Sequence, residues 1–523
     1  MVRLACQRMK KLSRIFVALF LISQIANAAS LADPAPPKFV ELDEKAAPVP
    51  QPFERLTFHA APKPISKNAK TADWPRLLGP NDNVTSPETH LLHDWPPAGP
   101  AKVWEVRKGD GYTSPAISGA MLVLFHSLDG KETIECLQTE TGRRFWKQDY
   151  AIEYKDRYGF SNGPRGSPII SEGRVVTIGV TSILTCLDLK TGRIAWQRDL
   201  KNEFNVPQDF FGHGGSALIL DGKVIVNVGG KAEKIDESIS MQERVRMLAA
   251  PGLCVGAFDI RTGKLVWGVK DEWGASYASP IAAKLHGKPV VLVFAGGESK
   301  PASGGLLCIN PADGTVHDRF PWRADDYISA TAQSPTVIAE KNRVFISTCY
   351  PKGKPLGSIM LEFDENLKAK EVWRSNKISI HFMNPLYMSG HLYAIDGETE
   401  QKAQLVCFDA DNGSEKWRKD VNWNDDELTR LNGGRAAQMG IMRAGLLGVD
   451  GKVLCLGESG ALIWFDLSPT DLKLEARAQL FYAPHTWCLP ALSNGLLYIM
   501  QNSEEQVRGK TGQRILCYDL RAP

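Results

Sequence analysis

The sequence lacks the short motifs that mark many metal-dependent and redox enzymes. It contains no His-Glu-x-x-His segment and no Cys-x-x-Cys pair, and Gly509-Lys510-Thr511 has Glu504 where a phosphate-binding loop needs glycine. It also lacks an excess of charge of either sign, because 62 basic residues face 59 acidic ones. A basic excess is the usual mark of nucleic-acid binding, so we expect no nucleic-acid partner.

Long apolar runs are scarce as well. The run Ile15 to Ile22 is too short to span a bilayer as a helix, follows five basic residues and precedes Ala26-Asn27-Ala28, a small-residue cleavage site. This order predicts a secretory signal peptide over residues 1–28 and an exported protein, periplasmic or extracellular, with no transmembrane segment in the mature chain. Without the leader, 57 basic residues face 59 acidic ones, a net charge of −2. No cysteine follows the run, so a lipid anchor is not expected.

A disulfide framework is not expected either, although an exported protein with ten cysteines invites one. Cys6 leaves with the leader, and nine is an odd number. Five of the others, at positions 136, 186, 308, 407 and 517, occupy the same place in a repeated unit. Equivalent places in separate units lie too far apart to be bridged, so we interpret these cysteines as small buried apolar residues.

The repeated unit is the main feature of the chain. Its clearest copy runs from Cys186 through Asp188 and Thr191-Gly192 to Trp196, and it is typical of a strand, a tight turn and a second strand. Complete or degenerate copies begin at positions 136, 186, 257, 308, 362, 407, 464 and 517. Such a period indicates a solenoid or a propeller, and units made only of strands favour a propeller.

A second mark recurs about two strands before each copy. It is a small residue followed by proline, or a remnant of that pair, at 114–115, 167–168, 216–217, 279–280, 334–335, 384–385, 438–439 and 489–490. Proline is tolerated at the first residue of a strand. The sequence therefore predicts an all-β, eight-bladed β-propeller of four-stranded antiparallel blades over residues 73–523.

Both ends of this domain are incomplete. The last copy, Cys517-Tyr518-Asp519, has no tryptophan after it, whereas Trp104 has no copy before it. We therefore expect the N-terminal strand Val103 to Val106 to be the outer strand of the last blade and to close the ring, which removes exposed sheet edges. Residues 29–72 are rich in proline and alanine, which predicts a flexible or extended linker.

The Asp-x-x-Thr-Gly-x-x-x-Trp hairpin resembles the repeat of pyrroloquinoline-quinone (PQQ)-like β-propellers. That group includes quinoprotein dehydrogenases and the propeller lipoprotein of outer-membrane protein assembly. A dehydrogenase would imply PQQ with Ca²⁺, and such enzymes commonly stack the quinone on a disulfide between adjacent cysteines. This chain has no adjacent cysteines, and neither calcium ligands nor a general base can be assigned. We expect no cofactor, assign no catalytic or metal-binding residue, and keep PQQ with Ca²⁺ as the alternative.

The predicted ring offers one candidate ligand site. Residues just before each inner strand should surround the axis at one face, which we call the axial mouth: Tyr112, Arg165, His213, Tyr277, Gln333, His381, Arg435 and His485, with Trp487 nearby. Polar and aromatic groups that converge on a concavity form a default ligand site. The alternative is that they hydrogen-bond to neighbouring loops. Three histidines suggest a metal, but they come from separate blades, so we expect none.

Two further segments have alternative interpretations. Gly159-Phe160-Ser161-Asn162-Gly163 has the spacing of a hydrolase nucleophile elbow, but a proline follows where that motif needs a helix. Residues 231–251 form an insertion with loosely helical spacing, either a surface helix over a blade or a partner-binding helix.

Taken with the leader, these features predict an exported, non-catalytic binding or scaffold propeller of the periplasm or cell envelope. The partner would be an envelope protein, a peptide, a carbohydrate or another small molecule. The alternative is a PQQ-dependent dehydrogenase with divergent cofactor ligands.

Overall fold

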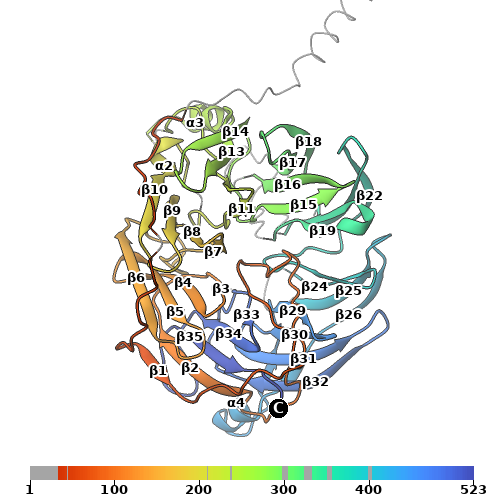
Figure 1. Ribbon diagram of the computed structural model, residues 1–523. Helices are drawn as coiled ribbons and strands as arrows, with labels where there is room; N and C mark the ends of the chain where they lie inside the picture. Colours follow the sequence, from red (N-terminus) through yellow and green to blue (C-terminus); the bar gives the residue numbers. More distant parts are fainter. Residues whose placement is uncertain are drawn as a thin grey trace, which may run out of the picture.

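The computed structural model describes residues 33–43, 45–208, 210–235, 238–296, 304–322, 333–349, 356–397 and 403–523. The predicted signal peptide, residues 1–28, lies outside this range. The described chain forms the predicted eight-bladed propeller of four-stranded antiparallel blades, which follow one another around a central axis (Figure 1). Within blades one to seven the strands run in chain order from the axis outward.

The first four blades follow the repeat closely, and their strands are as follows. Blade one contains β3 (Ala116–Ser118), β4 (Met121–Leu128), β5 (Lys131–Gln138) and β6 (Arg144–Ala151). Blade two contains β7 (Ile169–Ser171), β8 (Arg174–Ile178), β9 (Ile183–Asp188) and β10 (Ile194–Asp199). Blade three contains β11 (Leu218–Leu220), β12 (Lys223–Asn227), β13 (Gly252–Asp259) and β14 (Leu265–Asp271). Blade four contains β15 (Ile281–Leu285), β16 (Lys288–Ala295), β17 (Gly305–Ile309) and β18 (Val316–Pro321).

The second four blades complete the ring. Blade five contains β19 (Thr336–Ile338), β20 (Arg343–Ser347), β21 (Ser358–Phe363) and β22 (Ala369–Ser375). Blade six contains β23 (Leu386–Met388), β24 (His391–Asp396), β25 (Gln404–Asp409) and β26 (Glu415–Lys419). Blade seven contains β29 (Gly445–Val449), β30 (Lys452–Leu456), β31 (Ala461–Leu467) and β32 (Leu472–Gln479). Blade eight contains β33 (Ala491–Ser493), β34 (Leu496–Gln501), β35 (Arg514–Asp519) and the N-terminal strand β2 (Ala101–Arg107).

The ring is closed as predicted, by strands from both ends of the domain. Trp104 on β2 pairs with Cys517 on β35, and Val106 pairs with Ile515. A fifth strand, β1 (Leu56–Phe58), adds to the outside of β2. The last blade therefore combines N-terminal and C-terminal strands, so neither end of the ring is left with an open edge.

The repeated tryptophan and glycine connect neighbouring blades. The indole N–H of Trp146 in blade one donates to the carbonyl of Leu189 in blade two at 2.8 Å. A side chain at Gly192 would place its Cβ 2.4 Å from the same indole ring. The same contact joins Trp104 to Gly142, Trp196 to Gly263, Trp267 to Gly314 and Trp373 to Gly413. The two halves of the motif therefore meet across the boundary between blades at these five positions.

The segment before the propeller packs against its outer side. Residues 33–72, for which a flexible or extended linker was predicted, make specific contacts where they are described. Asp33 bonds to the buried guanidinium of Arg198 at 2.6 Å and 3.0 Å, and Gln51 forms an isolated bridge with Arg144. These contacts tie the N-terminal segment to blades one and two.

The next segment crosses the end of the axis opposite the mouth. Trp74 pairs with Ile117 near the far end of the inner strand of blade one, and the carbonyl of Pro75 accepts from the N–H of Ile170 in blade two. Leu78 and Val84 pack in one cluster with inner-strand residues of blades four, six and seven. In Figure 1 this orange segment runs across the middle of the ring. We call residues 74–86 the axial plug.

Short additional elements lie in the connections between strands and between blades. They are α2 (Leu200–Glu203), α3 (Met241–Leu248), η1 (Ala339–Lys341), α4 (Asp426–Leu431) and a hairpin of β27 (Asn422–Asn424) with β28 (Gln438–Gly440). The helix α3 lies in the predicted insertion, and Leu248 is its buried residue. No helix in the described ranges is long and apolar enough to cross a membrane.

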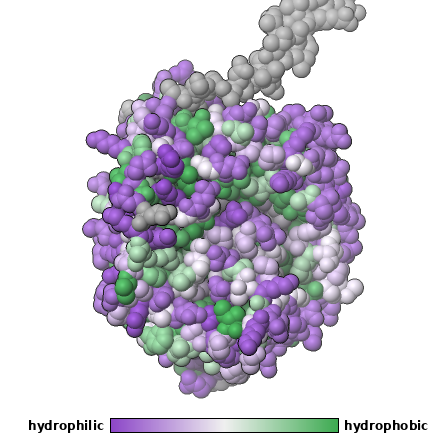
Figure 2. All heavy atoms as spheres, viewed as in Figure 1, coloured by the Kyte–Doolittle hydropathy of each residue, from purple (hydrophilic) through white to green (hydrophobic). Residues whose placement is uncertain are grey.

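The core is apolar and its thiols are enclosed. The nine cysteines of the described chain are buried, as the repeat predicted for those at its strand position. Burial raises the pKa of the Cys186 thiol to about 12 and that of Cys407 to about 11. The face seen in Figure 2 is mostly hydrophilic, with small separate hydrophobic patches.

Candidate functional site

A chain of hydrogen bonds forms the inner rim of the ring beneath the axial mouth. The backbone N–H of Ser114 donates to the hydroxyl of Ser167 in the next blade at 2.9 Å. The backbone N–H of Ser167 in turn donates to the hydroxyl of Ser216 at 2.8 Å. The pattern continues through Ser279 and Ser334 to Asn384. The small residues recognised in the sequence are therefore linkers between blades, and they fix the loops that carry the mouth residues.

Arg165 holds a loop over the mouth. Its guanidinium forms an ion pair with the buried carboxylate of Asp156 and donates to the carbonyls of Ser161 and Gly163, each at 3.2 Å. The Asp156 backbone N–H also donates to Asn162 at 2.9 Å. The loop 156–163 is thereby fixed from within, so the charge of Arg165 is already balanced by a carboxylate of the protein.

The loop places Phe160 against the other aromatic residues of the mouth. Its ring centroid lies 5.6 Å from those of His485 and Trp487 and 6.0 Å from that of Phe211. The Tyr112 hydroxyl donates to the Phe160 carbonyl at 3.2 Å. Phe160 remains 44% exposed, so an apolar ring faces solvent at the mouth. Phe160 is not recognisable from the sequence, because its segment matches only the spacing of a hydrolase motif that the following proline excludes.

Trp487 lies at the centre of this cluster. Its ring centroid is 4.5 Å from His485, 5.2 Å from Tyr112 and 5.2 Å from Phe382. The His381 ring in turn stacks on Phe382 with a centroid separation of 3.6 Å. The structure therefore brings four predicted residues, Tyr112, His381, His485 and Trp487, into one aromatic cluster, together with Arg165 at its edge.

The prediction for blade seven was wrong. Arg435 is exposed and follows α4, whereas the inner strand β29 of that blade begins only at Gly445. The hairpin of β27 with β28 and the helix α4 lie between blades six and seven and displace the expected position. Arg443 stands at the mouth instead, with its guanidinium 4.8 Å from the Trp487 ring centroid.

Arg443 belongs to a buried polar triad. It forms a two-pronged ion pair with Glu458 at 2.9 Å and 2.6 Å, and the indole N–H of Trp487 donates to the same carboxylate at 2.6 Å. Such bidentate pairs fix both partners geometrically. The triad therefore sets the orientation of the Trp487 ring and balances the charge of Arg443 within the protein.

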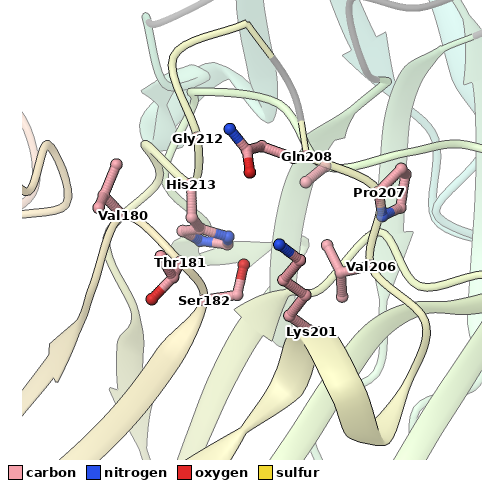
Figure 3. A pocket seen from close by; sticks show the side chains of 10 residues that line it. Val180, Thr181, Ser182, Lys201, Val206, Pro207, Gln208, Gly212 and His213 are labelled. Carbon is pink, nitrogen blue, oxygen red and sulfur yellow. The ribbon is translucent and has the colours of Figure 1, made fainter. Parts of the chain in front are cut away.

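The remaining predicted residues lie on the other side of the mouth. The Tyr277 hydroxyl accepts from the Phe211 backbone N–H at 3.0 Å and so supports the aromatic cluster. Gln333 is fully buried, and neither end of its amide has a hydrogen-bond partner in the described chain. His213 faces a small cavity between blades two and three (Figure 3).

The buried histidines are neutral at neutral pH. Burial lowers the pKa of His213 to about 4 and that of His381 to about 3. Within the described ranges, no group of three or more His, Cys, Asp or Glu side chains is arranged to hold a metal ion. The mouth can therefore offer aromatic faces and edges, while its two arginines are engaged with carboxylates.

Comparisons with known proteins agree with this architecture. The family described as outer membrane protein assembly factor BamB matches residues 130–419, which is more than half of the chain. No curated protein matches the sequence significantly.

Two solved structures share the fold at low sequence identity, and a third has a lower TM-score. The quinohemoprotein alcohol dehydrogenase from Comamonas testosteroni is 13% identical with a TM-score of 0.52, over 86% of this chain and 81% of that one. A europium-containing methanol dehydrogenase is 12% identical with a TM-score of 0.52, over 86% and 98% of the two chains. BamB from Moraxella catarrhalis is 14% identical with a TM-score of 0.46, over 81% and 98%.

Proposed function

Because the chain belongs to the family of the outer membrane protein assembly factor BamB, we propose that it is an exported, non-catalytic binding or scaffold propeller of the cell envelope. Its axial mouth holds a segment of an envelope protein, a peptide, a carbohydrate or another small ligand. The signal-peptide pattern of residues 1–28 and the envelope role named by the family support export to the periplasm or beyond.

The aromatic cluster of the mouth carries this proposal. Phe160, Tyr112 and Phe382 each contact the ring of Trp487, and Phe160 and Tyr158 are about half exposed. Clustered aromatic side chains with exposed faces are the usual anchors of protein and carbohydrate recognition. The rings are held by the two arginine–carboxylate pairs, so little conformational entropy is lost on binding.

The alternative function, a PQQ-dependent dehydrogenase with divergent ligands, fits the mouth less well. A quinone with several carboxylates requires cationic partners, but Arg165 and Arg443 already pair with Asp156 and Glu458, which are almost fully buried. Drawing either arginine away would leave a buried carboxylate uncompensated, at a cost of roughly 3–5 kcal/mol.

Site-specific crosslinking tests the proposal. A photoreactive amino acid at position 160 should give defined crosslinks in envelope extract, whereas one at Lys190, on an exposed turn at the opposite face, should not. Trp487→Ala should weaken the crosslinks from position 160. Equal crosslinking at both positions would contradict a ligand site at the mouth.

Calorimetric titration separates the two functions. We expect no saturable binding of PQQ, with or without Ca²⁺, and no dye reduction with alcohols or sugars. Micromolar binding that is lost in Arg443→Ala would support the dehydrogenase instead.

A further inference from the structure

A small cavity lies between blades two and three, beside the axial mouth. Its polar lining includes Lys201 on α2, Ser182 in the turn between β8 and β9, and His213 before β11, together with Thr181 and Gln208. In Figure 3 the Lys201 ammonium, the Ser182 hydroxyl and the His213 ring point into the same space. Val180, Val206, Pro207 and Ala275 contribute apolar walls.

The ammonium group of Lys201 forms no ion pair with the described residues. Among the described residues no carboxylate pairs with it, and its two acidic neighbours are engaged elsewhere. Asp199 accepts from the backbone N–H of Asn202 at 3.1 Å, and Glu203 pairs with the buried Arg198 at 2.6 Å. A lysine without a partner beside two engaged acids is available to an external anion.

The cavity matches an anion with a single negative charge. His213 is 6% exposed and neutral at neutral pH, and no acidic side chain of the described residues lines the cavity, so Lys201 supplies the one positive charge of its described lining. The enclosed space is small, with room for about one or two water-sized groups. A flat carboxylate meets both limits, whereas a phosphate group is larger and carries more charge.

The wall that carries Ser182 is fixed in advance. The Val180 N–H donates to the buried carboxylate of Glu132 at 2.6 Å, and the Val180 carbonyl accepts from the His213 N–H at 2.9 Å. The Ser182 N–H donates to the Gly179 carbonyl at 2.9 Å, which closes the turn. The polar groups are thus held in place before any ligand arrives, which favours binding.

We propose that this cavity binds a carboxylate group, with Lys201 as its ionic partner and Ser182 as a hydrogen-bond donor. The site is separate from the aromatic cluster of the mouth and does not depend on what the mouth binds. The carboxylate comes from a free organic acid, from the end of a peptide chain or from an acidic side chain, and these sources share the same recognition chemistry.

Methyl NMR of the full chain tests the site with acetate as the probe and acetamide as its neutral counterpart. Acetate should shift the methyl signals of Val180 and Val206 in a saturable way at constant ionic strength, and acetamide should not. Lys201→Gln should weaken acetate binding about tenfold or more, since a hydrogen bond to a charged group is lost. Lys201→Arg should keep most of the affinity. Lys190→Gln, which removes the same charge from the opposite face, should change nothing.

Three peptide probes identify the source of the carboxylate. They are acetyl-Ala-Ala with a free C-terminus, the same peptide amidated, and amidated acetyl-Ala-Glu-Ala. Tighter binding of the first than of acetate assigns a chain end, tighter binding of the third assigns an acidic side chain, and no gain for either assigns a free acid. The proposal is overturned if acetate gives no saturable shift, if acetamide binds equally, or if Lys201→Gln binds acetate like the wild type.

Discussion

The indole ring of Trp196 occupies the space that a side chain at residue 263 in the next blade would need. A Cβ on Gly263 would lie 2.6 Å from the ring, and the backbone φ there is +70°. Gly222 has nearly the same φ, +69°, but no atom within 4 Å of its would-be Cβ. One residue is therefore glycine for its conformation alone, and the other also for a contact between blades.

This pair allows a matched test of the blade contact. Gly222→Ala should cost roughly 1–2 kcal/mol, the strain of a left-handed residue. Gly263→Ala should cost the same strain plus roughly 1–3 kcal/mol for overpacking against Trp196. The free energies of unfolding in urea measure both. Equal losses would show that the Trp–Gly contact does not contribute to stability.

Removing the tryptophan tests the same boundary from the other side. Trp196→Ala should lower the free energy of unfolding by roughly 3–5 kcal/mol, because a large buried ring and its bond to the Ile260 carbonyl are lost. Binding at the mouth should stay nearly intact. The comparison is Trp487→Ala, which should mainly reduce binding. Full stability with abolished binding in Trp196→Ala would refute a structural role for the repeat.

Arg165 and Asp156 should be coupled through the loop over the mouth. Arg165→Met leaves the buried Asp156 carboxylate without its counter-charge, so we expect a loss of roughly 3–5 kcal/mol and faster hydrogen exchange in residues 156–163. Adding Asp156→Asn should recover part of the loss. Arg157→Met, on the same loop, removes only a guanidinium placed over Phe210 and is the control. Additive effects of the first two changes would contradict the coupling.

Glu132 should make stability depend on pH. Burial raises its pKa from 4.5 to about 7 in the folded protein. Between these values the folded state binds more protons than the unfolded state, so the free energy of unfolding falls as pH rises from about 4.5 to about 7. Relative to Glu132→Gln, the wild type should lose roughly 2–3 kcal/mol between pH 5 and pH 8. Glu153→Gln, at an exposed position, should follow the wild type at every pH.

The contact of Asp33 with Arg198 should anchor the N-terminal segment. Arg198 is fully enclosed and bonds to both carboxylate oxygens of Asp33. Asp33→Asn weakens this charge-assisted pair and should lower the free energy of unfolding by roughly 1–3 kcal/mol. Asp43→Asn, in an exposed carboxylate of the same segment, should cost almost nothing. Similar losses in both variants would contradict a specific anchor.

Much of the fold could be predicted because it repeats. Each Trp, Gly and Ser recurs at the boundary where it acts, so the blade number and the closure by Val103 to Val106 followed from spacing alone. The axial mouth was predictable only where the repeat is complete. In blade seven only a weak remnant of the small-residue mark is present, at 438–439, and an inserted helix and hairpin separate it from the inner strand, which is why the pattern points to Arg435 instead of Arg443.

The unpredicted parts of the candidate site depend on contacts between segments that share no sequence pattern. Phe160 reaches the mouth only because Arg165 binds Asp156 and folds the intervening loop back. Lys201 is notable only because both neighbouring acids have other partners, which no spacing reveals. These are pairings of individual side chains, and a single sequence does not indicate which pairs form.

The axial plug covers one end of the central axis, so the axial mouth at the other end is the open one. Because residues 74–86 pack against inner strands at one end of the axis, whatever occupies the centre arrives and departs through the same opening. A bound segment that covers the mouth would seal the interior completely, so release of anything beneath it would have to wait for that segment to dissociate.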